Sequence, residues 1–278
     1  MSLKRVEFMA AGAASIALTL PAHAAAERSP KTALHIRRLH WAGISLVVGD
    51  AQLFIDPVIE NPGDPPLSAE AKDRFAIVSH HHGDHFDAQN IATAIGDRGF
   101  LVIEESVAKW ADTRTLHVQR VAMYQPAMLP RGAATFCVIP VPAIDGLGAP
   151  QVSWVIEAAG LRALHLGDTQ WHGGFWDIAR AYGPFDVMFV PINGFQQVVA
   201  RYRKVGQPMS MSPQQARSAV ELFNPKVVVP IHYGEPDPPT YIEVDKPLEE
   251  FTSLMTASTS RVAVLKQGET LTLTRGLG

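Results

Sequence analysis

Residues 79–87 read Ser-His-His-His-Gly-Asp-His-Phe-Asp and come directly after an apolar stretch with the character of a buried strand. Four of the chain's 11 histidines and two aspartates fall within this segment. On an extended chain, side chains two residues apart point the same way, so His80 and His82 can reach one ion. His81 points away from both, which favours a role toward solvent or substrate over ligation. The segment predicts a metal site.

The second half of the segment extends this prediction to two ions. Gly83 allows the backbone to bend, and Asp84 and His85 can then reach an ion beside the first. Imidazoles and carboxylates without thiolates suit Zn²⁺, Mn²⁺ or Fe²⁺. A His-rich surface turn that binds metal adventitiously is the alternative.

Composition limits the class of protein. The chain has 278 residues, of which 47% are hydrophobic and 18% are charged, with a formal net charge of −3. These values exclude a disordered or fibrous protein and favour one large globular α/β domain. Because the charge is close to neutral, nucleic acid is not a favoured partner. A small-molecule substrate fits better, and the oligomeric state is open.

Short β-rich runs alternate with helical segments, which predicts a two-sheet sandwich with helices outside. Glycines separate the first three runs in a hairpin-like pattern, which indicates an antiparallel start. Residues 57–74 are rich in proline and predict a long loop that forms one wall of a pocket. Helices are expected after Asp87, across Glu104–Ala111 and after Ser212, which forms a capping box with Gln215. The expected strands are Leu34–His40, Ile44–Val48, Gln52–Ile55, Phe75–Ser79, Phe100–Ile103, Thr135–Val141, Val152–Ala158, Arg162–Leu166, Val187–Pro191 and Val227–Ile231.

The pattern His80-x-His82-x-Asp84-His85 resembles the signature of the metallo-β-lactamase fold superfamily. That resemblance implies a four-layer αββα sandwich with a dinuclear metal site. It also implies that Asp168, after Leu164–Gly167, is the carboxylate that bridges the two metals, and that His232 closes the site. Pro230-Ile231-His232 is similar to the branch of ascorbate-phosphate lactonases and N-acyl phosphatidylethanolamine phospholipase D. Asp56-Pro57 and Met211 match the same branch, so the likeness spans residues 41–233.

One position departs from the superfamily pattern. The superfamily normally supplies a histidine as the third ligand of the first metal, and this chain has Asp145 there. A carboxylate is a competent hard ligand that makes the metal a weaker Lewis acid and moves the preference from zinc toward manganese or iron. Alternatively, Asp145 is a turn residue before Gly146, and the first metal is weakly held.

A complete site predicts hydrolysis. Two cations about 3.5–4 Å apart can share a water and lower its pKa from 15.7 to about 7, so that hydroxide attacks an ester, lactone, amide or phosphodiester. Two other functions stay open: a strict β-lactamase, which the ending at His232 disfavours, and a noncatalytic metal- or ligand-binding relative, which Asp145 suggests. Asp87 either supports a ligand imidazole or caps a helix. Asp56 either supports the ligand loop or makes a turn before Pro57.

Few signals address substrate binding. Asp84, His172 and Tyr233 are the candidate catalytic residues, with His172 and Tyr233 acting as acid or oxyanion donor; either of these two can equally be a packed polar residue. Arg201, Arg203 and Lys204 form a basic run that either anchors a phosphate or carboxylate or is a solvated loop.

The basic, apolar and small-residue segments of the N-terminus follow one another in the order of an export signal. Lys4 and Arg5 precede an apolar run over residues 8–20, and small residues lead to a cleavage site after Ala24. We expect residues 1–24 to be a signal peptide and residues 25–278 to be the periplasmic or secreted hydrolase domain, with the choice between Sec and Tat export open. A buried N-terminal helix is the alternative. The run is too short to span a bilayer, so no transmembrane anchor is expected. Cys137 is expected to be a small core hydrophobe.

Overall fold

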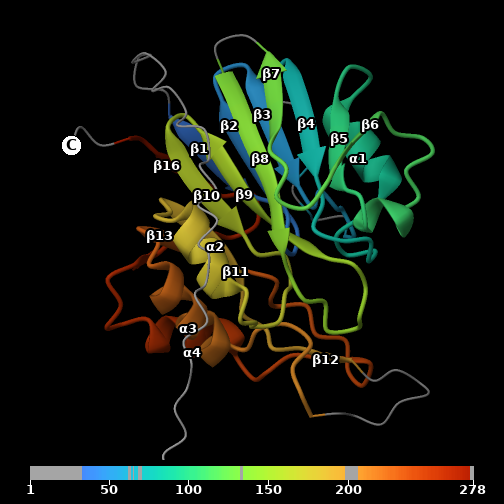
Figure 1. Ribbon diagram of the computed structural model, residues 1–278. Coiled ribbons are helices and arrows are strands. Elements are labelled where there is room, and N and C mark those ends of the chain that lie inside the picture. The colour runs from blue at the N-terminus through green and yellow to red at the C-terminus, as the bar shows by residue number, and fades with distance from the viewer. Residues whose placement is uncertain are drawn as a thin grey trace, which may run out of the picture. The chain divides into compact units, whose positions relative to one another are not determined.

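Two seven-stranded β-sheets form the centre of the structure, a computed structural model that describes residues 33–61, 64, 66–67, 71–131, 134–197 and 206–275 (Figure 1). All described residues belong to one compact unit, Lys31–Gly278. The first sheet contains, in spatial order, β16 (Thr270–Leu273), β1 (Leu34–Arg38), β2 (Ile44–Val48), β3 (Ala51–Ile55), β4 (Asp73–Ile77), β5 (Phe100–Glu104) and β6 (Val118–Val121). The second contains β15 (Arg261–Val262), β13 (Val227–Ile231), β11 (Val187–Pro191), β10 (Leu161–His165), β9 (Val152–Ala158), β8 (Ala134–Pro142) and β7 (Ala127–Arg131).

The helices cover the sheets, which completes the αββα arrangement. The α-helices are α1 (Ala88–Ile95), α2 (Phe175–Tyr182), α3 (Pro213–Phe223) and α4 (Pro247–Leu254). Helix α1 packs against β4 and β5, whereas α2 to α4 lie together over the second sheet (Figure 1). Apolar side chains of α2, α3 and α4, including Phe175, Val220 and Phe251, are fully buried with those of β11 and β13. Cys137 on β8 belongs to this cluster, which confirms its prediction as a core residue.

Strand direction decides where the loops meet. Strands β1, β2 and β3 are antiparallel, as expected, but β3 and β4 are parallel, and so are β10, β11 and β13. Parallel neighbours end at the same edge of a sheet, where the loops that follow them form a crevice. Between the sheets, the fully buried Trp154 on β9 donates its Nε1–H to the backbone oxygen of Val78, at 2.9 Å. The two sheets are therefore joined beside the His-rich segment.

Two of the expected helix starts are confirmed and one expected helix is wrong. Asp87 caps α1 by accepting the backbone N–H of Asn90 at 2.7 Å, and Ser212 forms its capping box at α3. The helix expected over Glu104–Ala111 is only the 3₁₀ turn Val107–Lys109. The reason is local, because the Glu104 carboxylate ends β5 and accepts the Ser106 backbone N–H at 2.7 Å, which closes a tight turn.

Other predictions differ in extent or fall outside the described residues. Strand β4 begins at Asp73, within the expected loop 57–74. The expected signal peptide, residues 1–24, lies outside the described residues, as does the basic run of Arg201, Arg203 and Lys204. Among the helices that the structure does describe, we find none with the length and apolar character that a bilayer crossing requires.

Candidate metal centre

Segments that leave the ends of five strands supply the candidate site. Asp56 follows β3, the His-rich segment follows β4, Asp145 follows β8, Asp168 follows β10 and His232 follows β13. Because β3 and β4 are parallel neighbours and β10 and β13 both flank β11 in parallel, these loops converge. The structure brings together all seven predicted ligands, namely His80, His82, Asp84, His85, Asp145, Asp168 and His232.

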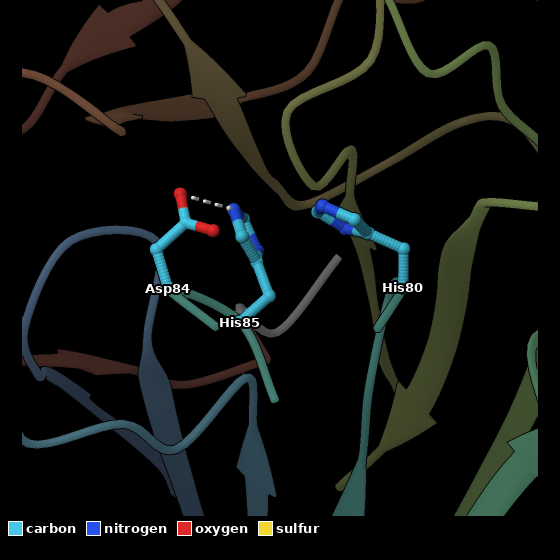
Figure 2. Close-up of side chains that lie close together, drawn as sticks. All are labelled: His80, Asp84 and His85. Carbon is cyan, nitrogen blue, oxygen red and sulfur yellow. Dashed lines mark ion pairs between the residues drawn. The ribbon is translucent and has the colours of Figure 1, made fainter. Parts of the chain in front are cut away.

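The seven side chains form three overlapping groups. Within each group the donor atoms lie within 4.8 Å of one another; the groups are His80–His82–Asp145, His80–Asp84–His85 and His85–Asp168–His232. Figure 2 shows the middle group, in which Asp84 faces His85 and the His80 imidazole turns toward the same space. The groups share His80 and His85, so they make one continuous cluster.

Asp168 lies between the two halves of the cluster. Its Oδ1 is 3.8 Å from His80 Nδ1 and its Oδ2 is 3.9 Å from His232 Nε2. The side chain of Gln151 holds the carboxylate by donating to Oδ1 at 2.5 Å. Gly167 has a φ of +64°, and a Cβ at that position would lie 2.9 Å from Ser79 Cβ, so a larger residue would displace Asp168 or the His-rich segment.

The two carboxylate oxygens of Asp145 have different surroundings. Its Oδ1 accepts the backbone N–H groups of Leu147 at 2.6 Å and Ala149 at 3.1 Å, which is the behaviour of a turn residue. Its Oδ2 lies 3.4 Å from His82 Nδ1 and 4.0 Å from His80 Nε2. One oxygen therefore fixes the loop while the other faces the two histidines.

A buried carboxylate orients two of the imidazoles. Asp56 accepts the Ser79 backbone N–H at 2.7 Å, the Ser79 hydroxyl at 2.8 Å and His85 Nδ1–H at 2.9 Å. Since the Ser79 hydroxyl gives its proton to Asp56, its oxygen accepts from His80 Nδ1–H, at 3.0 Å. Both imidazoles then present Nε2 to the cluster, which is the arrangement that supports a metal-bound histidine.

The unpaired polar atoms test whether a cation fits. The buried Nε2 atoms of His80, His85 and His232 have no hydrogen-bond partner. Burying a polar atom without a partner costs about 1–3 kcal/mol, and a cation bound in the cluster would give these three atoms a partner. Four imidazoles and three carboxylates are a donor set for divalent ions, so the residues fit a metal.

The pKa shifts of the cluster also indicate that its residues fit a cation. Burial alone would lower the pKa of His85, but the charges of Asp84 and Asp56 and the Asp56 hydrogen bond raise it to about 10. The site therefore stabilises positive charge at His85. Burial lowers the pKa of His232 to about 4 against the attraction of Asp84, which keeps that imidazole neutral, and burial raises the pKa of Asp168 to about 7.

Backbone conformations around the cluster are unusual for their residue types. Trp41, Asp56 and His232 have φ values of +53°, +46° and +56°, in the left-handed region that non-glycine residues seldom occupy. The backbone N–H of His232 donates to the Trp41 oxygen at 3.2 Å, and the two rings lie 4.4 Å apart. Such conformations persist where the surrounding structure imposes them, and here they aim side chains at one point.

A cavity of about 360 Å³ opens onto the cluster. Asp84 and Asp168 form part of its wall, together with Trp41, Phe195 and Tyr241. Trp41 donates Nε1–H to Asp84 Oδ2 at 3.0 Å. Sequence reasoning gave no role in the site to Trp41, Gln151, Phe195 or Tyr241, because no local motif marks them. The volume is that of a small-molecule site.

Two candidate catalytic residues, His172 and Tyr233, lie outside the cluster. The His172 ring packs on Phe175, with centroids 4.2 Å apart, and Tyr233 accepts a hydrogen bond from Arg38 Nη1 at 2.7 Å. Neither lines the cavity. His81, which was expected to point away from the ligands, belongs to none of the three groups and lies 5.2 Å from the Trp110 ring.

Comparison with known proteins gives consistent matches. Residues 51–233, well over half of the chain, match the sequence profile of the family described as "Beta-lactamase superfamily domain". A UPF0173 metal-dependent hydrolase from Thermococcus kodakarensis is 29% identical over 238 residues, which covers 82% of this chain and 95% of that protein. A UPF0173 metal-dependent hydrolase from Staphylothermus marinus is 30% identical over 225 residues, which covers 79% and 88%.

Solved structures show the same fold. Igni18, a metallo hydrolase from Ignicoccus hospitalis, superposes with a TM-score of 0.67 at 24% identity, covering 87% of this chain and 99% of that chain. CmlA, a diiron β-hydroxylase from Streptomyces venezuelae, superposes with a TM-score of 0.64 at 16% identity, covering 90% and 55%. These two neighbours are therefore named for different chemistries on a shared fold.

Proposed function

The chain belongs to the metallo-β-lactamase superfamily of metal-dependent hydrolases, and from this premise we propose that it uses two divalent ions to cleave an ester, lactone, amide or phosphodiester bond in a small molecule. The observation that carries the proposal is the convergence of seven imidazole and carboxylate side chains, three of them with unpaired buried Nε2 atoms, beside a cavity that His82, Asp84 and Asp168 line.

Each half of the cluster would hold one ion. His80, His82 and Asp145 would hold the first, Asp84, His85 and His232 the second, with Asp168 between them. Bound divalent ions supply Lewis acidity and lower the pKa of water, which is the chemistry that hydrolysis needs.

The remaining residues of the site prepare it for this reaction. Asp56 fixes the imidazoles of His80 and His85, and Trp41 fixes the Asp84 carboxylate. Because these side chains are held before substrate arrives, little reorganisation is needed during the reaction. The cavity of about 360 Å³ supports a small-molecule substrate and fixes no particular bond type.

The carboxylate at position 145 bears on metal preference. With Asp145, the donor set contains three carboxylates and four imidazoles, and Asp145 Oδ2 faces His80 and His82. We propose that this harder set accepts manganese or iron more readily than a set with a fifth imidazole, which would favour zinc.

The Asp145→His variant tests this metal preference. Elemental analysis of protein loaded in equal zinc, manganese and iron should show a zinc fraction that rises at least about threefold over wild type, because the added imidazole is a softer ligand. The matched control is Asp186→His, at a carboxylate that pairs with Lys226. This variant should leave the metal ratio unchanged. An unchanged ratio in Asp145→His would contradict the assignment of Asp145 as a ligand.

The function itself is tested with purified protein of known metal content. The substrate panel contains p-nitrophenyl acetate, bis(p-nitrophenyl) phosphate, a γ-lactone, an anilide and a chromogenic β-lactam. Hydrolysis that stops on chelation and returns with added metal is expected for at least one of the first four. Turnover of the β-lactam alone would favour the strict β-lactamase, and full metal occupancy without any turnover would favour the noncatalytic relative.

Two proposals concern residues outside the described part of the chain. We propose that residues 1–24 direct export, and N-terminal sequencing of the mature periplasmic or secreted protein should begin at Ala25. We also propose that Arg201, Arg203 and Lys204 favour anionic substrates. If so, the double variant Arg201→Ala, Arg203→Ala should raise the KM of an anionic ester but leave that of a neutral one unchanged.

A further inference from the structure

Tyr241 occupies the cavity wall beside the metal ligands. It lies on β14 (Tyr241–Ile242), which pairs with β12 (Gln196–Gln197). Its ring stacks on Phe195 with centroids 4.5 Å apart and meets the Trp41 ring edge-on at 5.9 Å. The same cavity is lined by Asp84 and Asp168. These contacts hold a phenol at a fixed position in the space that a substrate must enter.

The hydroxyl of Tyr241 receives a hydrogen bond. Asn193 Nδ2 lies 2.7 Å from Tyr241 Oη and 3.4 Å from Glu243 Oε1, while the Ser210 hydroxyl lies 2.6 Å from Asn193 Oδ1. A carboxylate can only accept, so the atom of Asn193 that faces Glu243 must be the NH₂ group. Tyr241 Oη therefore accepts from Asn193.

The hydroxyl proton of Tyr241 must then point elsewhere. Among the described residues, the hydrogen bond from Asn193 is the only one that Tyr241 Oη makes, and no residue accepts the Tyr241 proton. Tyr241 itself lines the cavity, together with Asp84 and Asp168. Burial raises the pKa of Tyr241 above its ordinary value, which keeps the proton on the hydroxyl.

We propose that Tyr241 is a catalytic residue that donates its O–H to the substrate oxygen on which negative charge develops. The Glu243–Asn193 contact turns the Asn193 NH₂ group toward Tyr241 Oη, so the Tyr241 proton is left for the hydrogen bond to substrate. This inference rests on the proposed hydrolysis, and it assigns to Tyr241 the donor role for which the sequence offered Tyr233. The proton remains on Tyr241 throughout, so the residue stabilises charge and transfers no atom.

The Tyr241→Phe variant removes the hydroxyl and keeps the ring that packs on Phe195. On the panel substrate with the highest turnover, kcat should fall about 10–100-fold while KM changes less than about threefold, since the hydrogen bond strengthens only as charge develops. The loss should be similar for esters with good and poor leaving groups. Metal content and the thermal midpoint should match wild type. Tyr124→Phe, at an exposed tyrosine, is the matched control and should retain full turnover.

Each result is decisive. Equal kcat in wild type and Tyr241→Phe would overturn the role of Tyr241 and leave the proposed function standing. A fall in kcat accompanied by lost metal would also overturn it, because the residue would then support the ligands. Absence of turnover in fully loaded wild type would overturn the proposed function, and this inference with it. A phosphonate analogue of the panel substrate with the highest turnover should bind to Tyr241→Phe about tenfold more weakly than to wild type, as measured by calorimetry.

Discussion

Replacing Asp168 by asparagine is expected to lower kcat/KM by at least about a hundredfold and to reduce bound metal by about one equivalent per chain. Asp168 is the carboxylate whose two oxygens face opposite halves of the cluster, toward His80 and His232. Asparagine keeps the shape and one neutral oxygen but removes the negative charge that would attract the two proposed cations. Elemental analysis and steady-state kinetics on the same preparation measure both effects.

A matched variant separates this effect from a general cost of removing a carboxylate. Asp177 pairs with Arg180 on the exposed surface of α2, so Asp177→Asn should leave metal content and kcat/KM within about twofold of wild type. Metal content and turnover of Asp168→Asn that equal those of Asp177→Asn would show that the cluster works without a shared carboxylate. The dinuclear site would then be wrong.

Asp56→Ala should cause the largest loss of stability among the residues of the site. The Asp56 side chain is fully buried and accepts three hydrogen bonds, from the Ser79 backbone, the Ser79 hydroxyl and His85. Its removal leaves these donors without an acceptor, and we expect the free energy of unfolding to fall by about 3 kcal/mol. Metal affinity should fall about 10–100-fold, because the imidazoles lose their orientation.

Urea unfolding of metal-free protein and competition with a chelator measure the two effects of Asp56→Ala separately. Asp50→Ala is the matched control, at an exposed turn before β3 where the only described ion pair, to Lys72, spans 3.8 Å. It should change the free energy of unfolding by less than about 0.5 kcal/mol. If the stability or metal affinity of Asp56→Ala matched that control, Asp56 would be only a turn residue before Pro57.

Local sequence patterns predicted most of the central strands. Four expected strands agree with the structure at both ends: Ile44–Val48, Val152–Ala158, Val187–Pro191 and Val227–Ile231. They are short, apolar and β-branched, so burial between two layers is their only favourable state. The helix expected over Glu104–Ala111 is wrong because a single side chain, Glu104, closes the turn. Propensity over eight residues does not detect such a contact.

Tyr233 and Tyr241 show which site residues local sequence patterns do not predict. Tyr233 adjoins a ligand in sequence, but β13 ends there and the side chain turns to Arg38, whose Cζ lies 4.5 Å from the Tyr233 ring centroid. Tyr241 is eight positions further along and reaches the cavity because β14 pairs with β12. Adjacent residues of a chain leave it in different directions, so closeness in sequence to a ligand does not place a side chain in the site.

The sequence by itself determined the two-sheet fold and the candidate ligands His80, His82, Asp84 and His85, because donor type and spacing after a strand end are properties of the chain. The resemblance of this segment to the metallo-β-lactamase fold superfamily added Asp145, Asp168 and His232 to the candidate ligands. Only the tertiary structure decided that one oxygen of Asp145 holds its loop while the other faces His82, that Asp56 orients two imidazoles, and that Tyr241 lines the cavity. Except for the contacts of Asp145 within its own loop, these facts depend on contacts between residues tens or hundreds of positions apart. Such contacts arise from strand pairing and packing, which no local pattern encodes.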